Sequence, residues 1–186
     1  GEAGYRLLVS YPHDPAAFTQ GLLYHKGLLY ESTGRYGQSR LRQVEPRTGV
    51  VRQQTLLPDH LFGEGLALIG EELIQLTWHA RELRVYSAQS LELRRILAYP
   101  REGWGATFDG QHLVVSDGSA RLYFLSVGDY QLQKLVTVTD QVESGSRFNA
   151  LESVCGLILA NVWGSARVAV IEPLGGKVLD WLDFTV

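Results

Sequence analysis

The sequence predicts an all-β fold, a β-propeller, because a repeat of about 40–45 residues occurs four times along the chain. Three of the four repeats open on a glycine, and these glycines (Gly21, Gly65 and Gly105) are 44 and 40 residues apart. Short apolar runs alternate with turns that contain glycine, aspartate or proline, and no run has the longer period of an amphipathic helix. The innermost strand of every propeller blade faces one central channel. Residues at the same position of different repeats are therefore expected to converge.

Each repeat contains four predicted strands in the same order. An inner strand is followed by a tight turn such as Asp109-Gly110, where glycine supplies the positive φ that hairpins need. A second strand, a third strand and an outer strand complete the blade. The blades are predicted at residues 18–57, 62–97, 102–138 and 146–182. Their second, third and outer strands are expected at residues 29–33, 41–44 and 50–56; 73–78, 83–86 and 92–97; 113–117, 122–125 and 131–138; and 157–163, 168–171 and 177–181.

The chain, residues 1–186, is predicted to form a single domain with two unusual ends. Residues 5–11 are expected to be an extra strand that closes the propeller by joining its last blade. The chain ends directly after the outer strand of the fourth repeat, so a further repeat of about 40 residues, the fifth blade, is expected to be missing. An unusual closure with four blades is the alternative.

Composition argues against several classes of function. The net charge of −3 offers no basic surface for nucleic acid, and no stretch approaches the ~18 apolar residues of a membrane span. No signal peptide is recognised in the chain. The five histidines form no cluster with cysteine or carboxylates that would suit zinc, so neither a metal nor another cofactor is expected. The single cysteine, Cys155, lies in an apolar run and is expected to be a small buried residue.

Polar and aromatic residues occupy the positions that are expected to face the channel. Gln20, Glu64, Trp104 and Asn149 are roughly equivalent by their place in the four repeats. Together they would line one end of the channel with a carboxylate, two amides and an indole face. Aromatic walls with a few polar groups are typical of a site for a small molecule or a peptide.

Glu64 is the strongest candidate for catalysis. It follows Phe62 and lies between Gly63 and Gly65, which permit close approach of the backbone. Aromatic walls would remove water from the carboxyl and raise its pKa, which suits general acid–base catalysis near neutral pH. The alternative is a solvated glutamate in a sharp turn at a strand end.

Three of the four tryptophans, Trp78, Trp104 and Trp163, fall at repeat starts or at the ends of second strands. Each is either a wall of a binding site or aromatic packing inside the propeller, and three at one rim favour the binding site. His79, beside Trp78, could reach the same rim, but a solvated turn residue is the simpler interpretation.

Motifs along essentially the whole chain resemble the plant and bacterial type of glutaminyl-peptide cyclotransferase, the glutaminyl cyclases. The residues that carry the resemblance, in chain order, are Pro12-His13-Asp14-Pro15, Ala17-Phe18-Thr19-Gln20-Gly21-Leu22, Tyr30-Glu31-Ser32-Thr33-Gly34, Tyr36-Gly37, Ser39, Leu41-Arg42, Phe62-Gly63-Glu64-Gly65-Leu66, Gln75-Leu76-Thr77-Trp78, Glu102-Gly103-Trp104-Gly105, Ser116-Asp117-Gly118-Ser119 and Ala160-Asn161-Val162-Trp163.

The resemblance implies a five-bladed propeller that converts the N-terminal glutamine of a peptide or protein to pyroglutamate and releases ammonia. It implies that Glu64 is the acid–base catalyst and that no metal takes part. Indole N–H groups and side-chain amides would then stabilise the oxyanion of the reaction. It also implies secretion or a periplasmic location, and it gives no oligomeric state. The substrate-binding residues that it implies are Phe18, Gln20, Phe62, Trp78, Trp104, Asn149 and Trp163.

The chain departs from the family pattern at two places. Ala150 stands where the fourth repeat of the family has a glutamate, and the inner strands of the fifth blade, which carry a lysine near the active site, are absent. Two other interpretations therefore stay open. One is an inactive, truncated propeller of the same family. The other is a carbohydrate-active propeller, for which Glu64 and Glu152 are the only plausible pair of carboxylates.

Overall fold

The computed structural model describes residues 5–139 and 145–185, and in these ranges every regular element is a β-strand. They contain no helix that is long and apolar enough to cross a membrane. The chain divides into two compact units. The first unit is Leu8–Trp104, and the second unit is Gly1–Leu7 with Gly105–Val186.

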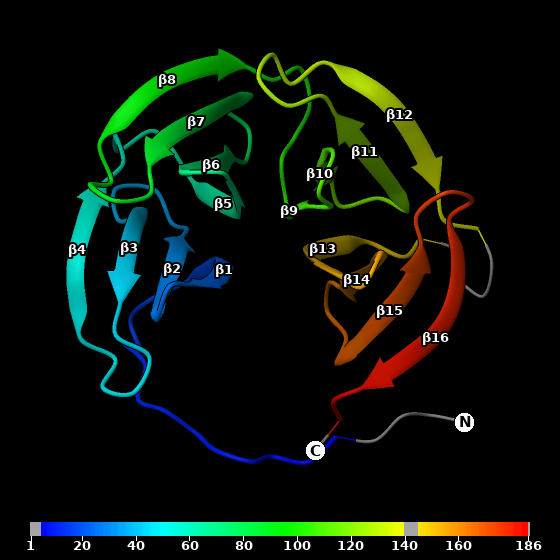
Figure 1. The fold of residues 1–186 in the computed structure, drawn as a ribbon, viewed down its shortest axis with the longest axis horizontal. Coiled ribbons are helices and arrows are strands. Elements are labelled where there is room, and N and C mark those ends of the chain that lie inside the picture. Colours follow the sequence, from blue (N-terminus) through cyan, green and yellow to red (C-terminus); the bar gives the residue numbers. More distant parts are fainter. Residues whose placement is uncertain (1–4, 140–144, 186) are drawn as a thin grey trace. The chain divides into compact units, whose positions relative to one another are not determined.

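The first unit contains two antiparallel sheets of four strands, coloured blue to green in Figure 1. In each sheet the strands follow one another in chain order, which is the form of a propeller blade. The first sheet is β1 (Thr19–His25), β2 (Leu28–Thr33), β3 (Arg40–Val44) and β4 (Val51–Leu56). The second sheet is β5 (Gly63–Ile69), β6 (Glu72–Thr77), β7 (Glu82–Ser87) and β8 (Leu93–Ala98).

The second unit repeats this arrangement with two more sheets of the same kind, coloured green to red in Figure 1. The first of them is β9 (Ala106–Phe108), β10 (Leu113–Ser116), β11 (Arg121–Leu125) and β12 (Leu132–Thr137). The second is β13 (Phe148–Val154), β14 (Leu157–Val162), β15 (Arg167–Glu172) and β16 (Lys177–Asp183).

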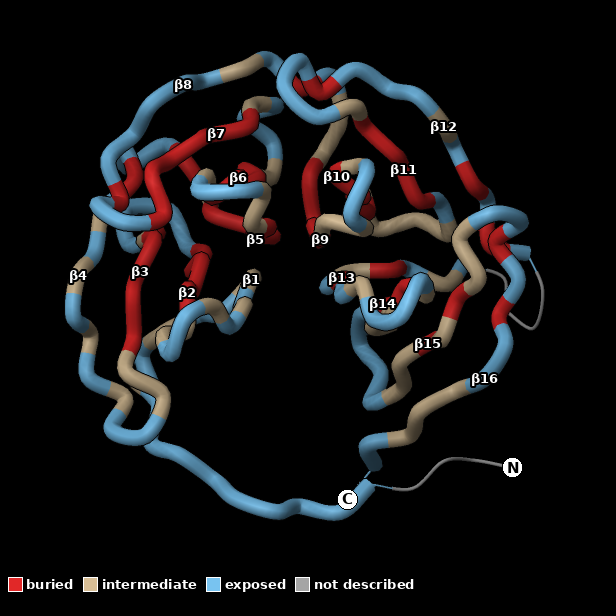
Figure 2. Tube along the Cα trace, viewed as in Figure 1, coloured by how far each residue is buried: buried red, intermediate tan, exposed pale blue. Residues whose placement is uncertain are grey.

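Burial differs systematically between the strands of a sheet, as Figure 2 shows. The middle strands β6 and β7 are buried along nearly their whole length, whereas β8 at the outer edge is mostly exposed. The sequences agree with this difference, because Leu-Ile-Gln-Leu-Thr in β6 is largely apolar, whereas Leu-Arg-Arg-Ile in β8 carries two adjacent charged residues. In β4 the burial alternates from residue to residue, as expected for a strand with one solvated face.

Each unit is held together by an apolar core between its two sheets. In the first unit the core joins Leu41 of β3 to Leu66 and Leu73 of the neighbouring sheet. In the second unit a larger core joins residues such as Leu122 and Phe148, both fully buried. Burying apolar surface between adjacent blades is the main stabilising term in such a fold.

The opening glycines of the repeats allow inner strands of neighbouring sheets to approach closely. A Cβ atom on Gly21 of β1 would lie 2.6 Å from the backbone nitrogen of Leu66 in β5. A Cβ atom on Gly105, just before β9, would lie 1.9 Å from the carbonyl oxygen of Asn149 in β13. Glycine is required at both positions because any side chain would force the two strands apart.

Two predictions differ from the structure. Residues 5–11, predicted as a closing strand, belong to no strand, because none of the described strands lies beside them to form a ladder of hydrogen bonds. Cys155, predicted to be buried, is exposed in the turn between β13 and β14, with a φ of 51°. The apolar residues around Cys155 belong to the two strands, and the cysteine itself is the first residue of the turn that joins them.

Candidate active site

Glu64 lies in a β-bulge at the start of β5. Gly63 pairs with Thr77 and Leu66 pairs with Gln75, so β5 advances by three residues while β6 advances by two. A bulge interrupts the alternation of side chains along a strand and turns one of them in a new direction, and bulges are frequent next to active sites. The bulge therefore explains how a carboxylate can occur in a strand that is otherwise buried.

The same irregularity occurs in two of the other inner strands. The register shift of β1 contains Gln20, and the register shift of β13 contains Asn149. Trp104 lies directly before β9. Three of the four residues that we considered equivalent from the repeats therefore share a backbone irregularity, which the sequence did not reveal.

The backbone on both sides of Glu64 is held from outside its own strand. The N–H of Gly63 donates to Ser39 Oγ at 3.0 Å, and the N–H of Gly65 donates to the carbonyl oxygen of Trp104 at 2.8 Å. Gly63 also has no room for a side chain, since a Cβ there would lie 2.4 Å from a backbone oxygen. These contacts fix the position of the Glu64 Cα and limit the directions that its side chain can take.

Burial dominates the electrostatics of Glu64. The residue is 6% exposed, and no hydrogen bond or ion pair to its carboxyl group is present in the part of the chain that the structure describes. Loss of hydration raises the pKa of Glu64 to about 9, and the negative charge of Glu102 acts in the same direction. The carboxyl group is therefore protonated at neutral pH and can donate a proton to a bound molecule and take one back.

Aromatic rings surround Phe62, two residues before Glu64. Edge contacts join the ring of Phe62 to the rings of Phe18, Tyr36 and Trp78, with centroid separations of 6.1, 5.4 and 5.5 Å. Phe18 and Tyr36 are 42% and 51% exposed, so the cluster presents apolar surface to solvent. Such a surface can bind the apolar part of a ligand while Glu64 acts on its polar part.

Glu102 joins two of the predicted tryptophans. Its Oε2 accepts a hydrogen bond from Nε1–H of Trp78 at 3.2 Å and another from Nε1–H of Trp104 at 3.1 Å. We expected indole N–H groups to stabilise an oxyanion of the substrate, but both of these donors are bound to Glu102. Trp78 is half-buried and Trp104 is buried, so both indoles lie within the site with their N–H groups engaged by Glu102.

His79 contacts the same group of residues. Its ring stacks on the ring of Trp78 with a centroid separation of 3.9 Å, and its Nδ1 lies 3.2 Å from Glu102 Oε1. The side chain is 52% exposed. The side chain of His79 is therefore exposed, as expected for a solvated turn residue. It also contacts Trp78 and Glu102, which was not expected.

A buried polar cluster lies behind the segment that leads into β1. Glu31, 1% exposed, accepts a hydrogen bond from Thr19 Oγ1 at 2.6 Å and contacts His13 Nε2 at 2.7 Å. Arg42 donates to Asp14 Oδ2 at 2.8 Å. His13 and Asp14 precede Phe18, and Thr19 follows it. These bonds therefore fix the backbone on both sides of Phe18, up to the bulge at Gln20.

The second unit contains the other two predicted substrate-binding residues. Asn149 has a buried Oδ1 with no hydrogen-bond partner among the described residues, and its carbonyl oxygen accepts from Ser116 Oγ at 2.6 Å. Trp163 is 55% exposed, and the guanidinium group of Arg147 lies 4.8 Å from the centroid of its ring. An unpartnered acceptor and an exposed indole are both suited to bind a polar ligand.

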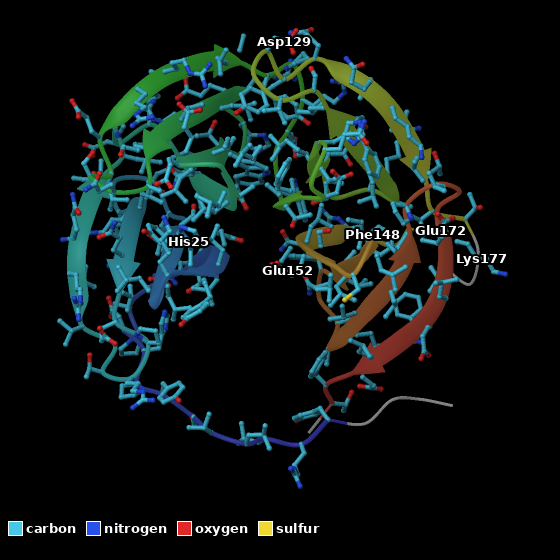
Figure 3. All side chains as sticks on the ribbon, in the orientation of Figure 1. His25, Asp129, Phe148, Glu152, Glu172 and Lys177 are labelled. Carbon is cyan, nitrogen blue, oxygen red and sulfur yellow. The ribbon has the colours of Figure 1, made fainter. Side chains whose placement is uncertain are left out.

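Glu152 is the second carboxylate of the carbohydrate interpretation. It lies on β13 and is exposed, whereas Phe148 at the start of the same strand is fully buried; Figure 3 labels both. Partial loss of hydration raises the pKa of Glu152. No hydrogen-bond donor to its carboxyl group is present within the described ranges.

A metal site was not expected from the sequence. Within residues 5–139 and 145–185, no group of three or more His, Cys, Asp or Glu side chains lies close enough together to hold a metal ion.

Comparison with known proteins gives the family. The model of the glutamine cyclotransferase family matches residues 1–186. The chain belongs to this family. A curated glutaminyl-peptide cyclotransferase of Arabidopsis thaliana is 39% identical over 184 residues, which is 95% of this chain and 56% of the relative. The chain therefore spans little more than half the length of that relative.

Solved structures support the same family and settle the fold class. The crystal structure of Myxococcus xanthus glutaminyl cyclase matches with a TM-score of 0.84 at 38% identity, over 93% of this chain and 73% of that chain. WD40 repeats of RRP9 match with a TM-score of 0.59 at 11% identity, over 86% and 49% of the two chains, which concerns the fold alone. The prediction of an all-β propeller is confirmed.

The structure adds contacts of three further residues to the predicted site. Glu102, His79 and Tyr36 all contact predicted site residues. Glu102 was noted only as part of the Glu102-Gly103-Trp104-Gly105 motif. Its position two residues before Trp104 was the one signal that could have pointed to it.

Proposed function

We propose that this protein cyclises the N-terminal glutamine of a peptide or protein to pyroglutamate and releases ammonia. The observation that carries the proposal is Glu64, a buried carboxyl group with a pKa of about 9 beside an aromatic cluster, in a member of the glutamine cyclotransferase family. The carbohydrate interpretation has no comparable support from the relatives.

The proposed reaction uses one proton carrier. The neutral α-amine attacks the γ-carboxamide carbon, which forms the C–N bond of the ring and places negative charge on the carbonyl oxygen. Protonated Glu64 donates its proton to the amide nitrogen, the carbon–nitrogen bond to that group breaks, and ammonia leaves. The ionised Glu64 then takes the extra proton from the ring nitrogen and returns to its starting state. Because the attack is intramolecular, no nucleophile of the enzyme is required.

The remaining predicted residues are proposed to bind and orient the substrate. The rings of Phe18, Phe62 and Trp78 offer an apolar wall, which favours the folded glutamine side chain over the extended one. Gln20 is proposed to hydrogen-bond the substrate amide. The family resemblance assigns Asn149 and Trp163 to substrate binding as well, and the unpartnered Oδ1 of Asn149 suits such a role.

We further propose that the reaction does not depend on a metal ion. All the steps above are proton transfers and one intramolecular acyl transfer, and Glu64 with a raised pKa can perform the proton transfers by itself.

The test is ammonia release from a dipeptide with N-terminal glutamine, measured with a chelator present. We compare the wild-type chain with Glu64→Gln, which keeps the shape of the side chain and removes the proton carrier. Glu92→Gln, in the exposed turn before β8, is the matched control. We expect chelator-resistant turnover that falls by about 10²–10⁴-fold in Glu64→Gln and is unchanged in Glu92→Gln.

Other outcomes would contradict separate parts of the proposal. Loss of turnover on chelation would contradict metal independence. Full activity of Glu64→Gln would contradict the role of Glu64. No turnover by a folded wild-type chain would favour the inactive propeller of the same family.

A further inference from the structure

The hydrogen bonds of Glu102 connect side chains from separate elements of the first unit. Trp78 follows β6, Trp104 precedes β9, and both indole N–H groups donate to the same oxygen, Oε2 of Glu102, at 3.2 and 3.1 Å. The other oxygen, Oε1, lies 3.2 Å from His79 Nδ1. An indole has a single donor, so the hydrogen bond fixes which edge of each ring faces Glu102.

We propose that Glu102 is a positioning residue of this active site, whose carboxylate holds the indole rings of Trp78 and Trp104 in the orientation that the substrate requires. This inference rests on the proposed function, because the rings need a fixed orientation only if a substrate binds at this site. It assigns to Glu102 a role that the sequence did not predict. Charged acceptors make stronger hydrogen bonds than neutral ones, so one carboxylate oxygen can hold both rings.

The backbone links these rings to the reacting group. The carbonyl oxygen of Trp104 accepts the N–H of Gly65 at 2.8 Å, directly after Glu64. The N–H of Trp78 donates to the carbonyl oxygen of Phe62 at 3.1 Å, two residues before Glu64. Both indoles are therefore attached to the segment that carries the proton donor, and a shift of either ring alters the surroundings of its carboxyl group.

Glu102 also acts on Glu64 through its charge. Its negative charge raises the pKa of Glu64, in addition to the larger effect of burial. The strands β1, β2 and β6 pack against β5 and carry other charged groups. Each of these groups is bound to another residue or lies at the end of β5 away from Glu64. Glu31 of β2 is bound to His13 and Thr19, and Glu72 of β6 pairs with arginines at the opposite end of β5.

Tyr24 and His25 are the titratable residues of β1, and both lie at the end of that strand away from the bulge. His79 faces Glu102 rather than Glu64, and when protonated it offsets part of the charge of Glu102. Glu102 is therefore the group through which charge reaches Glu64.

The test separates the two roles of Glu102 with two substitutions. Glu102→Gln keeps an oxygen acceptor for the indole N–H groups and removes the charge, whereas Glu102→Ala removes both. Glu92→Gln again serves as the control for loss of one carboxylate. Nuclear magnetic resonance follows the indole N–H signals of labelled tryptophan and the titration of the labelled Glu64 carboxyl carbon in each variant. Trp181, on β16 of the second unit, provides an internal reference.

We expect the Glu64 titration to move to lower pH in Glu102→Gln, with the indole signals of Trp78 and Trp104 close to wild type. In Glu102→Ala those two signals should shift while that of Trp181 stays. Its kcat/KM should fall by roughly tenfold to a hundredfold, because displaced walls no longer hold the reacting geometry. Glu92→Gln should match wild type in every measurement.

Unchanged indole signals of Trp78 and Trp104 in Glu102→Ala would overturn the proposal. An unchanged Glu64 titration in Glu102→Gln would remove the effect of the Glu102 charge on Glu64. Because Glu102 is partly exposed, thermal unfolding is recorded for each variant, and Glu102→Leu, which also removes both oxygen acceptors, provides the test if Glu102→Ala does not fold. The magnetic resonance measurements do not require turnover. A wild-type chain without cyclase activity would therefore contradict the proposed function. The indole signals would still show whether Glu102 holds the rings of Trp78 and Trp104.

Discussion

At the scale of single residues, the site combines two carboxyl groups in opposite surroundings. Glu64 is 6% exposed and accepts no hydrogen bond among the described residues, whereas Glu102 is partly exposed and accepts two indole N–H groups. Environments that differ in this way allow one carboxyl group to carry a proton while the other holds its neighbours in place. The two carboxyl groups, on separate segments of the first unit, therefore suit the two proposed roles of proton transfer and orientation.

Gly34 offers a test of the aromatic wall that leaves Glu64, the proposed proton carrier, unchanged. A Cβ at this position would lie 2.3 Å from Phe62 Cε1, and the φ of Gly34 is not positive, so alanine is acceptable to the backbone. We expect Gly34→Ala to displace the Phe62 ring and raise KM for a glutaminyl dipeptide by about tenfold, a modest loss of binding energy. Steady-state kinetics at fixed pH provides the measurement.

The control for this substitution is Gly175→Ala, where the tightest contact is a flexible carboxylate oxygen of Glu172 at 3.3 Å and φ is again not positive. Its KM should equal that of wild type. If Gly34→Ala also left KM unchanged, the Phe62 ring would not be part of the binding surface.

The repeats predicted part of this site, for a reason that can be stated physically. Glu64 and Gln20 were predicted as site residues because equivalent positions of a repeated backbone face the same way, and the structure places both in bulges of inner strands. Glu102 and Tyr36 were noted only as parts of motifs, and His79 was interpreted as a solvated turn residue, because their contacts are with side chains of other segments. Such contacts leave no periodic signal in one sequence.

At the scale of elements, turns decide where each strand ends. The turn between β13 and β14 has φ values of 51° at Cys155 and 79° at Gly156, and the turn between β1 and β2 has 48° at Lys26 and 86° at Gly27. Two consecutive positive φ values are the mark of a type I′ hairpin turn, in which asparagine is preferred at the first position. Cysteine and lysine are poor choices there.

Cys155→Asn should therefore stabilise the second unit. Asparagine tolerates the left-handed conformation better than cysteine, and we expect a gain of roughly 0.5–1 kcal/mol, or about 1–4 °C in the unfolding temperature. Thermal unfolding followed by circular dichroism is the measurement. Cys155→Ala, which removes the thiol and keeps the unfavourable φ, should show no gain. Equal stabilisation by both substitutions would mean that the thiol, and not the backbone, is the cause.

The strands were predicted more accurately than their surroundings. The predicted 113–117 corresponds to β10 (Leu113–Ser116), and the predicted 157–163 corresponds to β14 (Leu157–Val162). Apolar runs bounded by turn residues carry this information locally. The failures at residues 5–11 and Cys155 have other causes, since a strand requires a neighbour as well as a suitable sequence, and an apolar run does not mark where its turn lies.

At the scale of the whole molecule, the cost of keeping Glu64 buried is shared by the rest of the fold. Each unit has its own apolar core, and that of the first unit includes Leu66, two residues beyond Glu64. A buried carboxyl group that must stay protonated lowers the free energy of unfolding at every pH at which the same group is ionised in the unfolded chain. Burial of apolar side chains in the two cores offsets this cost.

This cost gives stability a predictable dependence on pH. The pKa of Glu64 is about 9 in the folded chain, against 4.5 as the ordinary value, so between these limits the folded state binds a proton that the unfolded state has lost. The free energy of unfolding is not reduced by Glu64 below about pH 4.5. As the pH rises towards 9, ionisation of this group in the unfolded chain lowers the free energy of unfolding by up to about 1.4 kcal/mol per pH unit.

Glu64→Gln should remove that dependence, because glutamine is neutral at every pH. We expect the variant to unfold at a higher temperature than wild type at pH 8 and at nearly the same temperature at pH 4.5. Thermal unfolding of both proteins at pH 4.5, 6, 7 and 8 tests this, with Glu92→Gln as the control that should follow wild type. Parallel curves for wild type and Glu64→Gln would show that the Glu64 carboxyl group is hydrated in the folded protein. The same result would remove the physical basis for its role as a proton donor at neutral pH.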